Sequence, residues 1–220
     1  MMLNAKIKQS GSALVYILVA IALMAALISS FASSDSQQTR SRNAFKLANK
    51  IQDQIDIIKA AIDECVVLYP EGDGIANPAT VYPQYPINPN ASYFDGSAMD
   101  GFTARYAKDI ACPGNPGETK DHTPIFGVNT GKSLQAAPTG LDDWLYFNGK
   151  GVTFGAQTHT GVYIYINAPA ASSDAFIDDA FTKVKSQYGN CEVDILTSAD
   201  PICTNKCLRY WIIRESPACP

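Results

Sequence analysis

The chain has 220 residues, of which 46% are hydrophobic and 17% charged, and its formal net charge is −4. A chain of this size accommodates one N-terminal membrane element and one globular domain, and a second full domain is not expected. The acidic balance and the lack of a basic cluster argue against nucleic acid as a partner, because phosphate binding needs many Lys and Arg side chains on one face.

An uncharged apolar run, residues 11–28, follows a short leader that contains Lys6 and Lys8. Extended by Phe31 and Ala32, the run reaches roughly the ~20 residues that a helix needs to cross ~30 Å of hydrocarbon. We therefore expect this segment to place the chain at or through a membrane at some stage. The run alone is compatible with a plain membrane anchor and with a secretory signal peptide cleaved before Ser33.

Helical periodicity continues beyond the apolar run. Apolar side chains recur at spacings of three and four, which predicts one buried helix face with charged residues opposite. The apolar positions are Ala44, Leu47, Ala48, Ile51, Ile55, Ile58, Ile62 and Cys65. The charged positions are Arg42, Lys46, Lys50, Asp53, Asp56, Lys59 and Asp63. No proline interrupts residues 13–68, so we expect one long helix over residues 12–65, apolar over 12–32 and amphipathic over 33–65.

This order of basic leader, Gly11–Ser12 junction, apolar run and amphipathic helix resembles the type IV pilins and the pseudopilins of type II secretion. The resemblance covers about the first 65 residues. It implies that residues 1–11 are a leader peptide, removed after Gly11 by a prepilin peptidase, and that the new N-terminus at Ser12 is methylated. It also implies an α+β, pilin-like fold, in which the long N-terminal helix packs against an antiparallel β-sheet head.

The function implied by the resemblance is structural and not enzymatic. The partners would be other pilin-like subunits and the membrane, contacted through the first part of the helix. The positions expected in that contact are Leu14, Tyr16, Ala20, Ala22, Ala25 and Ala26, because small residues let helices approach closely. The chain would lie in the bacterial inner membrane with its head in the periplasm before assembly, and in a periplasmic or extracellular filament afterwards.

Two positions depart from the family pattern. Members usually have an aromatic residue first after the glycine and a glutamate fifth, whereas this chain has Ser12 and Tyr16 at those places. A tyrosine hydroxyl is uncharged near neutral pH, so Tyr16 cannot replace the glutamate that neutralises a neighbouring amine in the filament. This departure favours a minor or tip subunit over the main shaft subunit.

Residues 66–220 are expected to form the globular, disulfide-bonded head. Residues 69–138 are rich in Pro, Gly, Asn and Asp, which predicts an extended loop layer with short strands. Beyond them, alternating or β-branched stretches predict strands at 144–147, 152–154, 162–166, 192–196 and 208–214. Asn148–Gly151 is expected as the hairpin turn between the first two of these strands.

Two patterns predict how helices cover this sheet. Val162, Ile164 and Ile166 share one face of their strand, and the amphipathic part of the long helix is their expected partner. A second helix is predicted over residues 174–188, with Ser172 or Ser173 as its N-cap. Its apolar stripe consists of Phe176, Ile177, Ala180, Phe181 and Val184.

All cysteines of the chain follow the apolar run. They are Cys65, Cys112, Cys191, Cys203, Cys207 and Cys219. An even number in a translocated part indicates up to three disulfides in an oxidising compartment, and six cysteines allow 15 pairings, among which the sequence does not choose. Free buried thiols are the alternative. A metal site is not expected, because Cys203 and Cys207 form a C-x₃-C pair and the two histidines are not at ligand spacing.

The sequence contains no recognisable catalytic motif, neither a nucleophile elbow nor a zinc-binding helix nor a phosphate loop. His122 and His159 lie in polar stretches and are expected at the surface. We expect no cofactor, although the resemblance raises calcium at Ser198 and Asp200, because some pseudopilins bind it through a C-terminal loop. A single Asp supplies too few of the 6–8 oxygen ligands that calcium takes, which argues against a site there. The alternative function is a secreted or membrane-anchored extracytoplasmic binding protein, with a signal peptide cleaved before Ser33.

Overall fold

The computed structural model describes residues 12–72, 78–86, 105–114, 123–169, 175–217 and 219. It divides into two compact units, Met1–Asn43 and Ala44–Pro220, and each is treated by itself. The long helix α1, Ser12–Leu68, contributes to both units and extends three residues beyond the predicted end at residue 65. The backbone N–H of Tyr69 still donates to the Cys65 carbonyl, at 2.9 Å.

In the first unit, the described residues belong to the first part of α1. Each large apolar side chain between Leu14 and Ile28 is exposed, from 51% at Val19 to 73% at Tyr16. No helix in the described part of the chain is both long and apolar enough to cross a membrane.

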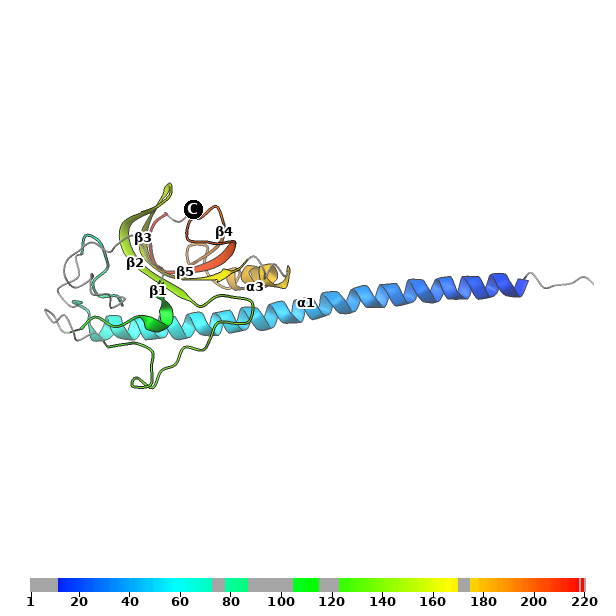
Figure 1. Ribbon diagram of the computed structural model, residues 1–220, viewed down its shortest axis with the longest axis horizontal. Helices are drawn as coiled ribbons and strands as arrows, with labels where there is room; N and C mark the ends of the chain where they lie inside the picture. Colours follow the sequence, from blue (N-terminus) through cyan, green and yellow to red (C-terminus); the bar gives the residue numbers. More distant parts are fainter. Residues whose placement is uncertain are drawn as a thin grey trace, which may run out of the picture. The chain divides into compact units, whose positions relative to one another are not determined.

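The second unit contains an antiparallel sheet of five strands in the order β1-β2-β3-β5-β4 (Figure 1). The strands are β1 (Arg105–Tyr106), β2 (Leu145–Phe154), β3 (Gln157–Ala168), β4 (Val193–Thr197) and β5 (Lys206–Ser216). A 3₁₀ helix, η1 (Ala107–Asp109), follows β1, and α3 (Ala175–Lys185) connects β3 to β4. The α+β class is therefore confirmed.

The main core lies between the helices and one face of this sheet. All eight predicted apolar positions of α1, from Ala44 to Cys65, are at most 6% exposed. They share one hydrophobic cluster with Val162, Ile164 and Ile166 of β3, which confirms the predicted packing of helix on sheet. The stripe of α3 joins the same cluster, with Phe176 only partly buried. The N-cap candidates Ser172 and Ser173 lie outside the described residues.

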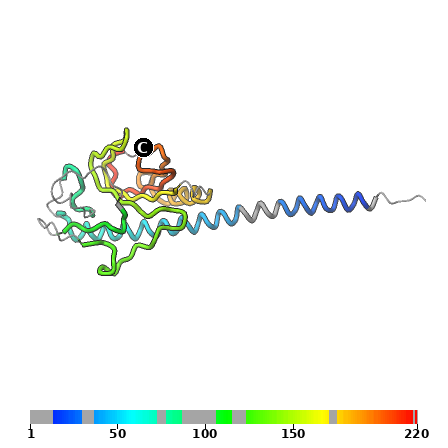
Figure 2. The backbone as a smooth tube through the Cα atoms, viewed as in Figure 1, coloured from blue at the N-terminus to red at the C-terminus, as the bar shows by residue number. Residues whose placement is uncertain are grey.

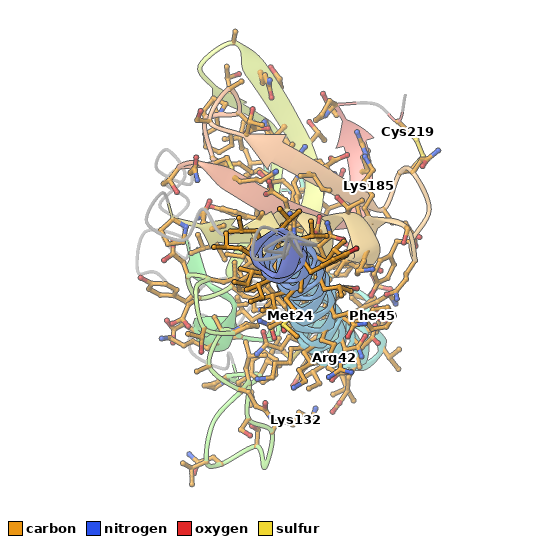
Figure 3. The ribbon with its side chains drawn as sticks, turned by 90° about the vertical axis from the view of Figure 1, so that its right-hand side faces the viewer. Met24, Arg42, Phe45, Lys132, Lys185 and Cys219 are labelled. Atoms are coloured by element: carbon orange, nitrogen blue, oxygen red, sulfur yellow. A yellow bond between two sulfur atoms is a disulfide. The ribbon has the colours of Figure 1, made fainter. Side chains whose placement is uncertain are left out.

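A segment that we call the strap, residues 123–143, crosses α1 on the side away from the sheet. The tube in Figure 2 follows it around the helix, and Figure 3 shows its Lys132 on that side. Polar contacts attach the strap to α1. The Gln54 side-chain amide donates to the carbonyls of Gln135 and Ala136, at 3.2 and 2.9 Å, and Lys132 forms a salt bridge with Glu64. The second half of α1 is thus held between the sheet and the strap.

The predicted hairpin turn at Asn148–Gly151 is wrong. β2 continues through these residues to Phe154, and the turn to β3 lies at Gly155 and Ala156, with Gly155 at a φ of 55°. The Asn148 side chain accepts the N–H of Tyr82 at 2.9 Å and donates to the Tyr82 carbonyl at 3.1 Å. It therefore anchors a neighbouring segment along β2 instead of turning the chain.

Gly149 and Gly151, which suggested a turn, lie at an irregularity in the strand pairing instead. The pairing of β2 with β3 shifts register between Gly149 and Val152, which is a bulge in the ladder. A Cβ at Gly149 would lie 2.7 Å from the Phe147 ring, so any larger residue would force this buried ring to move. Glycine in a strand often marks such a bulge or a close contact.

Candidate functional site

The residues predicted to carry assembly lie on the first part of α1. Leu14, Tyr16, Ala20, Ala22, Ala25 and Ala26 are all exposed in the unit that contains them. Ser12 is the first residue of the helix, whereas Gly11, the predicted processing position, lies outside the described residues. The candidate assembly site is therefore a continuous apolar stretch of helix with alanines distributed along it.

All six cysteines are paired, so the free-thiol alternative is excluded. The pairs are Cys65–Cys112, Cys191–Cys219 and Cys203–Cys207, with Cα–Cα distances of 5.3, 5.2 and 5.7 Å. The first connects the end of α1 to the segment after η1, and the second connects the C-terminal end to the start of β4. The third closes the turn between β4 and β5.

A cluster of charged side chains lies on the second face of the sheet, away from α1. Asp194 of β4 and Arg209 of β5 are directly paired across the strands, and Arg209 is only 2% exposed. The Arg209 guanidinium donates to one Asp194 oxygen from Nη2 at 2.9 Å, and Trp211 Nε1 donates to the same oxygen at 2.7 Å. Arg214 Nη1 donates to the other oxygen, at 3.1 Å.

These contacts determine the charge of Asp194. Burial acts to raise the pKa of its carboxyl, but hydrogen bonds from Trp211 and Arg209 and the positive charges of Arg209 and Arg214 outweigh burial and hold that pKa below its usual range. The Arg209 guanidinium also lies 4.5 Å from the ring centroid of Trp211 and 5.2 Å from that of Tyr163. The cluster therefore carries a fully ionised acid between two arginines.

His159 belongs to this cluster, so its predicted surface position is wrong. Its side chain is 0% exposed, because β3 begins at Gln157 and directs His159 toward the second face of the sheet. Nδ1 lies 3.1 Å from the Tyr163 hydroxyl, while Nε2 is buried and finds no hydrogen-bond partner among the residues that the structure describes. Burial, and then the charge of Arg209, lower the pKa of His159, which keeps the ring neutral. His122 lies outside the described residues.

The proposed calcium position at Asp200 is also part of the cluster. Asp200 is buried, with one oxygen 3.5 Å from Arg209 Nη1 and the other accepting the N–H of Ile202 at 3.2 Å. Ser198 is exposed on the same loop. A calcium ion at Asp200 would lie next to the arginine charge. Among the described residues, no group of three or more His, Cys, Asp or Glu side chains could hold a metal ion.

The cluster joins β4, β5 and the 198–203 loop to the aromatic side chains of β3, and we interpret it as structural. Sequence reasoning missed Asp194, Arg209 and Arg214. The available signal was the alternation in the last strand, which places Cys207, Arg209 and Trp211 on one face. Their acidic partner becomes evident only once the register of β4 against β5 is known. The chain matches no protein-family model, no curated protein and no solved structure.

Proposed function

We propose that the chain is a structural subunit of a filament of the type IV pilus or type II secretion pseudopilus kind. The observation that carries this proposal is the contrast within α1. Its first part leaves apolar side chains exposed along residues 14–28, whereas its second part buries one apolar face in the head. A helix that is apolar all round needs lipid or other helices around it, while an amphipathic one needs only its own domain.

The mechanism is assembly without turnover. The first part of α1 enters the inner membrane, the leader is removed after Gly11 by a prepilin peptidase, and the helix then exchanges lipid for neighbouring helices. Because lipid is as apolar as the side chains, association of the helices is driven by close packing. Small residues permit this close packing, and they are Ala20, Ala22, Ala25 and Ala26. The disulfide-bonded head remains on the periplasmic side and then outside the filament core.

The position of the subunit within the filament follows from Ser12 and Tyr16. A subunit with tyrosine at the fifth place after the glycine lacks the carboxylate that would neutralise the amine of a neighbour. We infer a minor or tip position, where that interaction is dispensable. The alternative, a binding protein released before Ser33, requires cleavage inside α1, because residues on both sides of that bond are helical.

Two matched variants test the proposal in the cells that produce the protein. Gly11→Val removes the small residue before the predicted cleavage site, and Ala32→Val removes the small residue before the alternative site at Ser33. We expect Gly11→Val to retain residues 1–11 and Ala32→Val to be processed like the natural chain, as measured by intact mass. Normal processing of Gly11→Val together with blocked processing of Ala32→Val refutes the proposal.

A further inference from the structure

The outer part of the hairpin formed by β2 and β3, residues 152–159, is a flap with little support from the rest of the sheet. β3 pairs with β5 from Thr160 onward, so in the described sheet residues 157–159 pair with β2 alone. The Ser216 hydroxyl of β5 still reaches the flap and donates to the Thr158 carbonyl, at 2.9 Å. Figure 1 shows the turn of this hairpin projecting beyond the neighbouring strands. An isolated two-stranded hairpin is marginally stable in water, so the flap depends on its side-chain contacts.

Glycines lie at the base of the flap on both strands. Gly149 of β2 and Gly161 of β3 are directly paired, and the register of β2 against β3 shifts between Gly149 and Val152. The pairing of β3 with β5 also shifts, between Thr160 and Gly161. Gly151 has a φ of 68°, a conformation that glycine adopts readily. Because the regular ladder is interrupted there, the backbone can bend at these residues without disturbing the strand pairs of the core.

His159 attaches the flap to the rest of the head. Of residues 152–159, all of which the structure describes, it is the one that is buried, at 0% exposed. Its ring centroid lies 5.1 Å from that of Phe154 and 6.4 Å from that of Phe147, and its Nδ1 lies 3.1 Å from the Tyr163 hydroxyl. Nε2 is buried and has no hydrogen-bond partner in the described part of the chain. The uncharged ring thus packs as an apolar group and holds the flap against the sheet.

The charges around His159 are already balanced without it. Arg209 Nη1 lies 3.5 Å from its Nδ1, and an Asp200 oxygen lies 3.5 Å from the same Nη1. Asp194 of β4 and Arg214 of β5 complete the cluster, so two arginines face two carboxylates. The neighbours that β2 and β3 contribute are phenyl rings and a tyrosine hydroxyl whose pKa is raised by burial, and they are uncharged.

A proton on His159 adds a positive charge that nothing in this cluster balances. The new charge lies beside Arg209, and among the described residues the protonated Nε2 has no acceptor. Burial and then the Arg209 charge lower the pKa of His159, while Asp200 acts in the opposite direction. A buried charge without a partner is costly, and exposure of the ring to water removes that cost.

We infer that His159 is an acid-sensitive latch: when it takes up a proton, the flap bends away at its glycines and carries the imidazolium into water, while the rest of the head stays folded. Phe154 and His159 leave together, which uncovers the Phe147 ring, stacked on Tyr163 at 4.5 Å between centroids. The open flap is a minor population of the folded head, and the closed form with an uncharged His159 predominates. The inference concerns the head alone and does not depend on the proposed filament.

Hydrogen exchange followed by mass spectrometry tests this inference on the full chain in detergent, at about pH 7.5 and about pH 5, between which histidine is the side chain that ordinarily titrates. Protection of peptides within the flap, corrected for the intrinsic exchange rate at each pH, should fall by up to about 30-fold at the lower pH. The reason is that a histidine which ionises only in the open form shifts the opening equilibrium by at most about tenfold per pH unit below ~6.5.

The same experiment shows whether the opening is local. At the higher pH the flap should already be less protected than the second half of α1. Low, non-denaturing urea should change the protection of the flap less than that of α1, because a local opening exposes little surface. A flap with the protection and urea dependence of α1 at both pH values overturns the inference, since it would then open only when the whole head unfolds.

Matched variants assign the response to one side chain. His159→Gln and His159→Phe both remove the titrating group, and His159→Phe keeps an uncharged ring in the same place. Both should show flap protection that no longer depends on pH, with the protection of α1 as the check that the head is folded. His122→Gln, which removes the other histidine of the chain, should keep the natural pH response. No pH response in the natural chain, or one that persists in both His159 variants, overturns the inference.

Discussion

The buried charge cluster makes a strong prediction for Asp194→Asn. In the structure the Asp194 carboxylate accepts hydrogen bonds from Nε and Nη2 of Arg209, from Trp211 and from Arg214. Removing its charge leaves the buried Arg209, among the described residues, with Asp200 as its one remaining acidic partner, whose nearest oxygen is 3.5 Å away. Breaking one partner out of a buried ion pair costs about 3–5 kcal/mol, and the neighbouring Asp200 places the expected loss near the lower end, about 3 kcal/mol.

The assay is denaturant unfolding of the full chain in detergent, followed by tryptophan fluorescence. Asp178→Asn is the matched control, because Asp178 also forms a salt bridge, with Lys206, but on the exposed surface. We expect Asp178→Asn to cost less than about 1 kcal/mol. The joint replacement of Asp194 by Leu, Asp200 by Asn and Arg209 by Met should recover most of the stability, because both acidic partners are removed together with the buried guanidinium. If Asp194→Asn costs no more than Asp178→Asn, the account of the cluster is wrong.

Three further variants test other parts of the head. As pH falls below ~6.5, the free energy of unfolding of the natural chain should decrease by up to about 1.4 kcal/mol per pH unit, because the lowered pKa of His159 lets only the unfolded state take up that proton. His159→Gln should lack this contribution, and identical pH profiles of variant and natural chain would contradict the prediction. Replacing Cys65 and Cys112 by Ser opens a loop with a sequence separation of 47 and should cost about 4 kcal/mol, checked by the denaturation midpoint against the oxidised natural chain. Gln54→Leu leaves the Trp144 N–H and two strap carbonyls without their Gln54 partner and should cost about 2 kcal/mol, whereas Gln38→Leu, at an exposed position of the same helix, should cost little.

Local periodicity predicted the elements whose partners are apolar. The apolar spacing from Ala44 to Cys65 and the alternation from Val162 to Ile166 predicted two surfaces, and these surfaces meet in the main core. Hydrophobic burial is non-directional, so the pattern of each element is sufficient to indicate which face is buried. The covering element could also be predicted, because the sequence contains one long amphipathic helix whose apolar face needs a partner.

The wrong predictions concern residues whose roles depend on long-range contacts. Asn148 and Gly149 have the composition of a turn, yet their positions are determined by Tyr82 and by the Phe147 ring. His159 lies in a polar stretch, but the strand extends further than its apolar part and buries it. From the sequence alone Arg209 would be expected to face solvent, because its pairing with Asp194 across β4 and β5 depends on the strand register. Such polar pairs are set by strand register, which single-residue patterns do not contain.

The mass of the mature N-terminal peptide tests the central claim most directly. The natural full-length chain is purified from the producing cells, digested, and its N-terminal peptide identified by mass spectrometry. The filament-subunit account predicts a chain that begins at Ser12, with the α-amine methylated. A chain that begins at Ser33 would contradict the account, as would one that retains Met1 as a plain membrane anchor.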